Sequence, residues 1–277
     1  MNFMDKKSIP LSRPPLPKEH GSWAMLGVPL FIGFVVAAVW SWRSLWLILA
    51  ALGLYLVRFP IDTLIKTRQR VKADRVWLIR WTVIYSAITV VSGAWLIVIE
   101  RLSDLIWLGA IGVALLIYHW WLVEQRQEMS VRGELAGIIG LALGAPLAYY
   151  TARGQFDGTA AALWLVDALY FGGTVFYIKL KVRQQPREPK PDRVSERLIK
   201  AKACLTYQSV VLTIALVLVA VDHLPGLVFL AFIPMTLKVI YGAATWQDKQ
   251  SLSLPRLGVM ELAQAALFAV LIVSAFG

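Results

Sequence analysis

Nine stretches of apolar residues run along this chain, each near the roughly 20 residues that cross a hydrocarbon core about 30 Å thick as a helix. None alternates between apolar and polar positions as a half-buried strand does, and only helices or closed barrels satisfy their backbone in lipid. The pattern therefore predicts an all-α, polytopic membrane bundle. Its nine predicted spans are Ser22–Trp40, Ser44–Ile65, Trp77–Ile99, Leu105–Val123, Leu135–Ala152, Ala160–Ile178, Cys204–Val221, Pro225–Ala244 and Gly258–Phe276.

Basic residues between the spans fall almost entirely in every second gap. Of the 28 lysines and arginines, 22 lie in the N-terminal segment and in the second, fourth, sixth and eighth gaps, and three lie in the other gaps. Basic loops stay on the cytoplasmic side of a membrane. We therefore expect the N-terminus inside the cell and the C-terminus outside.

No long polar insert interrupts this pattern. We expect a cytoplasmic N-terminal arm over residues 1–21 and a single transmembrane domain over residues 22–277, with a long cytoplasmic loop at residues 183–203. Orientation and anionic lipid head groups account for the net charge of +11, so the expected partners include membrane lipids and exclude nucleic acid. The single cysteine, Cys204, excludes an internal disulfide.

Three charged residues at the inner end of the second span share one helix face, because Arg58, Asp62 and Lys66 are spaced by four. A charge deep in a span costs about 2.5–3.5 kcal/mol on insertion scales, so it needs a partner or a water-filled cavity. Pro60 interrupts the hydrogen-bond ladder between them. Two interpretations stay open, an ion-pair series within one helix and the wall of a polar pocket that opens to the cytoplasm.

Polar side chains alternate with apolar ones at the end of the sixth span, at Tyr177, Lys179, Lys181 and Arg183. They are either the positive charges that end a span or a cationic site for phosphate or carboxylate. Asp167 lies higher in the same span, as a counter-ion for Arg80 or as part of a proton path.

The fourth gap supplies acids. Glu124 and Glu128 share a helix face near His119, while Arg132 and Glu134 stand at the start of the fifth span. These residues have the chemistry of metal ligands or of a general acid and base, but carboxylates and a histidine near a loop favour a solvated, salt-bridged turn.

His20 lies directly before the first span, in the segment PKEHGSWAM. Ser22 or Gly21 in that segment can begin the helix, which is ordinary capping. A charged cluster at a helix N-terminus is also a natural anion site, and its histidine can supply a general acid or base.

Four motifs together resemble the YwiC-like family of bacterial membrane proteins: PKEHGSWAM, EMSVRGELAG, FYIKLKVR and RLGVMELA. The resemblance covers nearly the whole chain and implies a multi-pass protein of the bacterial inner membrane. More distantly, the topology is similar to that of the UbiA-type intramembrane prenyltransferases. That similarity implies a UbiA-like bundle with functional loops after the second, fourth, sixth and eighth spans.

In UbiA-type proteins two Asp-rich motifs, at the inner ends of the second and sixth spans, hold magnesium and a prenyl diphosphate. This chain keeps only Asp62 at the first position, and it has Lys179, Lys181 and Arg183 at the second. Two carboxylates plus a substrate phosphate are a common minimum for holding magnesium. The Asp-rich motifs are not intact, so the metal and any other cofactor stay unknown.

The leading hypothesis is a prenyltransferase-like membrane enzyme that acts on an isoprenoid or another amphipathic substrate with an anionic head group. The candidate catalytic residues are Asp62, Glu128, Glu134 and His20. The candidate substrate-binding residues are Arg58, Lys66, Arg132, Tyr177, Lys179, Lys181 and Arg183. The alternatives are a transporter or lipid-binding protein without catalysis, and an assembly protein that docks partners on its basic face.

Overall fold

The structure, a computed structural model, describes residues 14–17, 20–66, 72–247 and 253–277, of which residues 20 and 72–74 are described by their backbone only. The described residues form helices joined by short turns, and no strand occurs among them. In chain order the elements are α1 (His20–Ala37), α2 (Arg43–Lys66), α3 (Lys72–Ala94), the π-helix η1 (Trp95–Ile99), α4 (Leu105–Glu124), α5 (Val131–Ala142), α6 (Gly144–Arg153), α7 (Gly158–Ile178), the π-helix η2 (Lys179–Gln184), the 3-10 turn η3 (Gln185–Arg187), α8 (Val194–Lys200), α9 (Lys202–Ala220), α10 (Gly226–Ala244) and α11 (Leu254–Phe276).

Eight helical segments of the described chain are long and apolar enough to cross a membrane, namely Arg43–Lys66, Arg75–Ile99, Leu105–Glu124, Val131–Arg153, Gly158–Arg187, Lys202–Ala220, Gly226–Ala244 and Leu254–Phe276. They overlap eight of the nine predicted spans. The remaining one, the first in the chain, is the shorter apolar helix Gly21–Ala37, which contains Pro29. The chain is therefore a multi-pass helical membrane protein, whose described residues include eight candidate spans and one shorter apolar helix.

The fifth predicted span, Leu135–Ala152, consists of two helices, because the chain breaks at Leu143 between α5 and α6. Pro146 in the first turn of α6 has no N–H with which to continue the ladder of α5. Leu143 is buried, as a break at membrane depth has to be. The break lets α6 lie along α1, where a Cβ added to Gly144 would come 3.2 Å from Cγ of Leu30.

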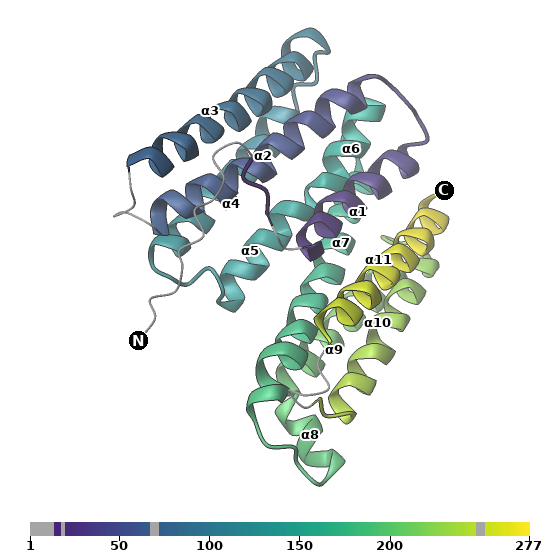
Figure 1. Cartoon of the computed structure of the whole chain (residues 1–277). Helices are drawn as coiled ribbons and strands as arrows, with labels where there is room; N and C mark the ends of the chain where they lie inside the picture. The colour runs from purple at the N-terminus through teal and green to yellow at the C-terminus, as the bar shows by residue number, and fades with distance from the viewer. Residues whose placement is uncertain (1–13, 18–19, 67–71, 248–252) are drawn as a thin grey trace.

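The helices form two groups, and α1 lies at the boundary between them (Figure 1). The first helix group contains α1 to α6 and the second contains α7 to α11, and α1 packs against both α6 and α11. Gly33 permits the close approach to α6, because a Cβ there would collide with the carbonyl oxygen of Ala145. Helix α7 joins the groups through its contacts with α5, α6, α9 and α10.

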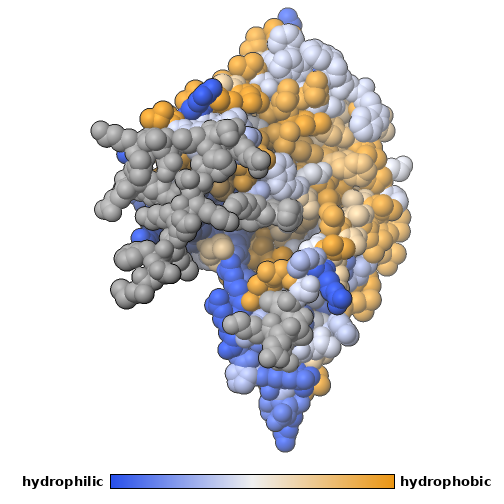
Figure 2. Space-filling view, in the orientation of Figure 1, coloured by the Kyte–Doolittle hydropathy of each residue, from blue (hydrophilic) through white to orange (hydrophobic). Residues whose placement is uncertain are grey.

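A broad apolar surface covers the middle of the molecule, and hydrophilic residues gather at the end that carries α8 (Figure 2). Many large apolar side chains are exposed, among them Trp40 at 75%, Val83 at 61% and Val270 at 60%. A soluble monomer rarely exposes apolar area on this scale, whereas lipid solvates it.

Contacts between loops show which helix ends meet. At one end, here called the basic end, Lys66 pairs with Glu128, and Arg197 donates to the carbonyl of Ala244. At the opposite end, Arg43 pairs with Glu100. The even gaps thus share one end of the bundle and the first and third gaps share the other, as the up-and-down topology requires. Which end faces the cytoplasm stays a prediction.

Candidate functional site

A small apolar cavity of about 110 Å³ lies inside the first helix group. Its walls come from α1, α2, α4, α5 and α6, and three glycines on α5 and α6 keep the wall open. A Cβ added to Gly137 would meet no atom within 4 Å, so this position faces open space. The lining residues are Leu26, Ala51, Leu54, Tyr55, Arg58, Gly112, Leu115, Leu116, His119, Ala136, Gly137, Gly140, Leu141, Gly144 and Leu147.

A polar cavity of about 180 Å³ adjoins it toward the basic end. It is lined by Pro17, Ser22, Tyr55, Arg58, Phe59, Asp62, Thr63, Lys66, Glu128 and Met129. Tyr55 and Arg58 line both cavities, so the two spaces share one wall. The result is an amphipathic site, apolar within the bundle and charged toward its basic end.

A histidine, an aspartate and an arginine meet where the cavities join. Nε2 of His119 lies 3.2 Å from Oδ2 of Asp62, and Nε of Arg58 lies 3.5 Å from the same oxygen. His119 is buried, while Arg58 and Asp62 are partly exposed to the cavity. The other carboxylate oxygen of Asp62, Oδ1, is buried and has no hydrogen-bond partner among the described residues. An acceptor in that position calls for a donor.

Glu128 forms the opposite wall of the polar cavity. Its Oε1 lies 2.9 Å from Nζ of Lys66, which joins the α4–α5 loop to the end of α2. Burial by itself raises the pKa of Glu128, but hydrogen bonds from Lys66 and from the backbone, with the charge of Lys66, lower it below its ordinary value. Gly133 permits the loop to pack closely against the start of α5, since a Cβ there would lie 2.6 Å from the carbonyl oxygen of Glu128.

A second ion cluster borders this loop. Nζ of Lys179 lies 2.6 Å from Oε2 of Glu134, and Arg183 lies 3.4 Å from Oε1 of the same carboxylate. Arg183 also donates to the carbonyl of Met129, a residue of the polar cavity. The cluster therefore ties η2 to the mouth of the cavity, while Arg132 nearby is exposed.

Two predicted substrate-binding residues lie apart from this site. Lys181 is buried, and its Nζ donates to the carbonyls of Gly242 at 3.0 Å and Thr245 at 2.8 Å. It thereby binds carbonyls at the end of α10, a common role for a basic side chain. Tyr177 is buried against α10, with its ring 4.4 Å from Nζ of Lys238. Neither residue lines the cavities.

Sequence reasoning misses part of the site. Tyr55, whose hydroxyl lies 2.5 Å from Oγ of Ser22, is not among the predicted residues, because an aromatic residue in an apolar span is typical of packing. His119 is predicted only as a metal ligand. The usable signal is its place one helix turn from the end of an otherwise apolar span. His20 begins α1, and its side chain lies outside the described residues.

The described residues do not fit a magnesium site. No group of three or more His, Cys, Asp or Glu side chains is close enough to hold a metal ion in the described part of the chain. Asp62 faces Arg58 and His119, and Glu128 faces Lys66, so cations of the protein occupy the places where a metal would need carboxylates.

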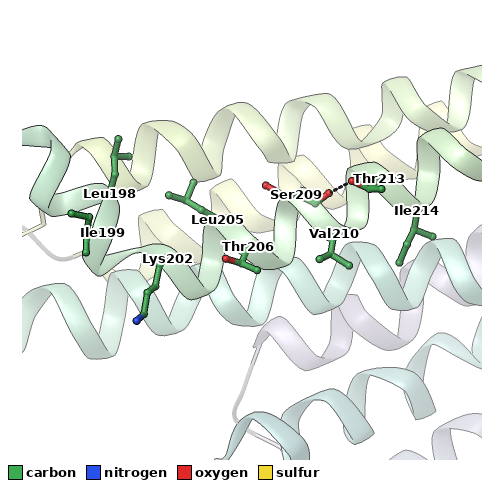
Figure 3. Close-up of a pocket in the computed structure, with 9 residues that line it drawn as sticks. All are labelled: Leu198, Ile199, Lys202, Leu205, Thr206, Ser209, Val210, Thr213 and Ile214. Atoms are coloured by element: carbon green, nitrogen blue, oxygen red, sulfur yellow. Dashed lines mark hydrogen bonds between the residues drawn. The ribbon is translucent and has the colours of Figure 1, made fainter.

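A shallow groove of about 600 Å³ runs along α8 and α9 (Figure 3). Figure 3 shows Lys202 near one end and a row of apolar side chains with three hydroxyls beyond it. Ile199 in this groove is 67% exposed. The groove has one charged side chain and no convergent polar groups, so the paired cavities are the stronger candidate site.

Comparison with known proteins gives a family and no activity. A family model described as "YwiC-like protein" matches residues 16–149. A protein of Bacillus subtilis (strain 168), described as "Uncharacterized protein YwiC", is 25% identical over 254 residues, which cover 91% of this chain and 94% of that protein. An "Uncharacterized protein" of Haemophilus influenzae (strain ATCC 51907 / DSM 11121 / KW20 / Rd) is 25% identical over 274 residues, with 93% and 96% coverage. No solved structure matches the chain.

The matched segment includes the two motifs PKEHGSWAM and EMSVRGELAG, and it contains every residue that lines the paired cavities. Both relatives extend the similarity over the second helix group. The chain is thus similar to the YwiC-like family model over residues 16–149 and to both relatives over nearly its whole length.

Proposed function

We propose that this protein is a prenyltransferase-like membrane enzyme that binds an amphipathic substrate in the paired cavities. One observation carries the proposal, namely the wall of Tyr55 and Arg58 that the apolar and the polar cavity share. When a molecule fills both cavities, its charged head lies beside Arg58 and Lys66 and its hydrocarbon part lies among leucines and glycines. Pockets for such ligands combine apolar walls with a few placed polar groups.

The volumes define what fits. At about 180 and about 110 Å³, the two cavities together approach the lower end of the range of ~300–1,000 Å³ for small-molecule pockets. They accommodate a head group and the first part of a chain, and a longer tail continues between the helices into lipid.

The free acceptor Asp62 Oδ1 supplies the chemistry of this proposal. Arg58 and His119 hold Oδ2, which leaves the buried Oδ1 as the acceptor that a donor on the substrate would satisfy. Asp62 is the general base that takes the proton from the acceptor substrate during transfer. Arg58 and Lys66 neutralise the anionic leaving group. Glu134 and Glu128 position the cations around this site.

Binding can be measured with defined probes. Purified full-length protein in vesicles of phosphatidylethanolamine and phosphatidylglycerol is titrated with dodecyl phosphate, and with dodecanol and inorganic phosphate as half-probes. Dodecyl phosphate binds best if both cavities are used. Arg58→Ala weakens its binding ~10-fold or more, because a hydrogen bond to a charged group is lost. Gly137→Leu fills the apolar cavity and also weakens it.

Two matched controls accompany these variants. Arg80 is an exposed arginine on α3 away from both cavities, and a Cβ on Gly109 of α4 meets open space without lining either one. Arg80→Ala and Gly109→Leu should leave the affinity unchanged. Equal affinities in all four variants would reject the site.

Transfer chemistry needs a separate assay. The same vesicles are incubated with labelled farnesyl diphosphate and a phenolic acceptor, with and without magnesium. Prenylated product that is lost in Asp62→Asn supports the enzyme. Dodecyl phosphate binding without any turnover removes the transfer step and leaves a binding protein or transporter. Ionisable residues buried in the second helix group favour transport as the second candidate.

We also propose that the protein lies in the bacterial inner membrane with its basic end toward the cytoplasm. Exposed Gln127 lies at the basic end and exposed Ser103 at the opposite end. In a Cys204→Ala background, Ser103→Cys should react with an impermeant maleimide on intact cells, and Gln127→Cys only after lysis. The reverse labelling would invert the topology.

A further inference from the structure

A line of polar side chains runs along the buried face of α7 and into η2. Its five members, spaced by three and four residues so that they share one helix face, are Asp167, Tyr170, Thr174, Tyr177 and Lys181. Every one of them is buried. The line is about 20 Å long at the 1.5 Å rise of a helix, so it crosses much of a bilayer core.

Helices α10 and α11 continue this line with an ion pair. Nζ of Lys238 lies 2.8 Å from Oε1 of Glu261, and Nζ of Lys238 lies 4.4 Å from the ring of Tyr177. Thr174 is buried between Tyr170 and Tyr177 on the same face of α7. The ring of Tyr170 stacks on Phe268 of α11 at 3.8 Å between centroids. We call these residues, with Lys238 and Glu261, the α7 polar line.

Asp167 ends the α7 polar line inside the membrane. Its side chain is 1% exposed, and neither carboxylate oxygen has a hydrogen-bond partner among the described residues. It does not pair with Arg80, which is exposed on α3. An ionised carboxylate without a partner is very costly in such surroundings, so the site favours the neutral acid. In this neutral form, the carboxyl group of Asp167 carries a bound proton.

The two ends of the α7 polar line differ in chemistry. Beyond Asp167 the same face of α7 carries the buried apolar residues Ala160 and Leu163, which offer no hydrogen-bonding side chain. Toward the basic end it reaches Lys181, bonded to the carbonyl of Thr245 at the end of α10. Further titratable groups near this line are Cys204 and Tyr207 of α9 and Tyr241 of α10.

We propose that Asp167 is a proton-binding site in the membrane interior that exchanges its proton with the basic end through Thr174, Tyr177 and the Lys238–Glu261 pair. Chains of ionisable and hydroxyl groups carry protons in this way in pumps and transporters. None of these residues lines the paired cavities, so the proposal stands or falls independently of the substrate site.

Infrared spectroscopy separates a working proton site from a sealed structural acid. The carbonyl stretch of a protonated carboxylic acid is recorded for the full-length protein in the vesicles described above, first in H2O and then after transfer to D2O. The difference between wild type and Asp167→Asn isolates the band of Asp167. We expect that band to be present and to shift as its proton exchanges for deuterium.

Variants along the path test the route. Thr174→Val removes one hydroxyl and should slow the exchange roughly 10-fold, the effect of one lost hydrogen bond in the path. Thr213→Val on an exposed face of α9 and Asp222→Asn in an exposed turn are the controls and should exchange at the wild-type rate.

Three results would overturn the proposal. The first is the absence of an acid band for Asp167 in wild type, which means that the carboxyl is ionised. The second is a band that does not shift in D2O, which means that the acid is sealed. The third is exchange at the wild-type rate in Thr174→Val. The first two outcomes need only wild type and Asp167→Asn, so a Thr174→Val variant that fails to fold leaves them decisive.

Discussion

Charged side chains are more exposed in the first helix group than in the second. In the first group, Arg58, Asp62 and Lys66 stand around cavities, and the side chain of Lys66 is 45% exposed. In the second group, Lys238 and Glu261 form a pair enclosed by packed helices, with the Lys238 side chain only 6% exposed. The difference is one of solvation. Charges that water or a ligand can reach cost little to keep apart, whereas enclosed charges depend on each other.

This contrast suits the first group to binding a ligand and the second to binding a proton. A cavity lined by charges of both signs accepts a head group, because its members can exchange a protein partner for a ligand. An enclosed line of polar groups has no room for a ligand larger than a proton. The predictions that follow test whether the contrast holds in solution.

The largest effect is expected for the enclosed pair. Lys238→Ala leaves Glu261 charged and buried, and removal of one partner of such a pair costs about 3–5 kcal/mol. Lys66→Ala removes a partner of a partly exposed pair and should cost at most about 1 kcal/mol. Denaturant unfolding of both variants in the same detergent measures the two free energies. Equal losses would mean that the two pairs are equally solvated.

A double variant sharpens this comparison. Lys238→Met combined with Glu261→Leu replaces the pair by apolar side chains of similar volume and should recover most of the stability lost in Lys238→Ala. A double variant as unstable as Lys238→Ala would show that packing rather than unpaired charge explains the loss.

A medium effect is expected at two helical glycines. A Cβ on Gly172 of α7 would collide with the hydroxyl of Tyr207, so Gly172→Ala should cost about 1–3 kcal/mol. Gly137→Ala in the first group enters open space and should stabilise its helix by roughly 0.5–1 kcal/mol. Thermal unfolding temperatures of the two variants should move in opposite directions. A loss in both would show that the apolar cavity is not open.

The smallest effect concerns Glu128. Its pKa is lowered in the folded protein, so its ion pair stabilises the fold above the pKa of the unfolded chain and is lost as the pH falls through the folded pKa. At pH 7, Glu128→Gln should be less stable than wild type by at most about 1 kcal/mol. The difference in unfolding temperature should shrink as the pH falls through the folded pKa of Glu128 and vanish once that carboxylate is protonated. A difference that persists there would not come from charge.

Lys179 and Lys181 show why sequence reasoning finds part of the site and not all of it. Both follow the sixth span in the same basic run, and both are candidates for one cationic site by their chemistry. The structure turns Lys179 toward Glu134 and buries Lys181 against the carbonyls of α10. Residues two apart on a helix point in different directions, and only the neighbouring helices decide which direction is buried.

Arg58, Asp62 and Lys66 show the opposite case. Their spacing of four is enough to place them on one helix face, and all three line one cavity in the folded chain. Their partners, His119 and Glu128, come from α4 and the loop after it, far along the chain. Spacing within one helix is local information, and pairing between helices is not.

The sequence by itself determined the solvent, the helical class, the positions of the spans and the alternation of their ends, because a bilayer requires long apolar helices and basic loops on one side. Tertiary structure alone decided that α1 lies between two groups and which charges face a cavity. In lipid all apolar faces are alike to the solvent, so small residues and polar contacts between helices choose the partners. Those contacts separate an open, charged cavity from an enclosed line of polar groups in one chain.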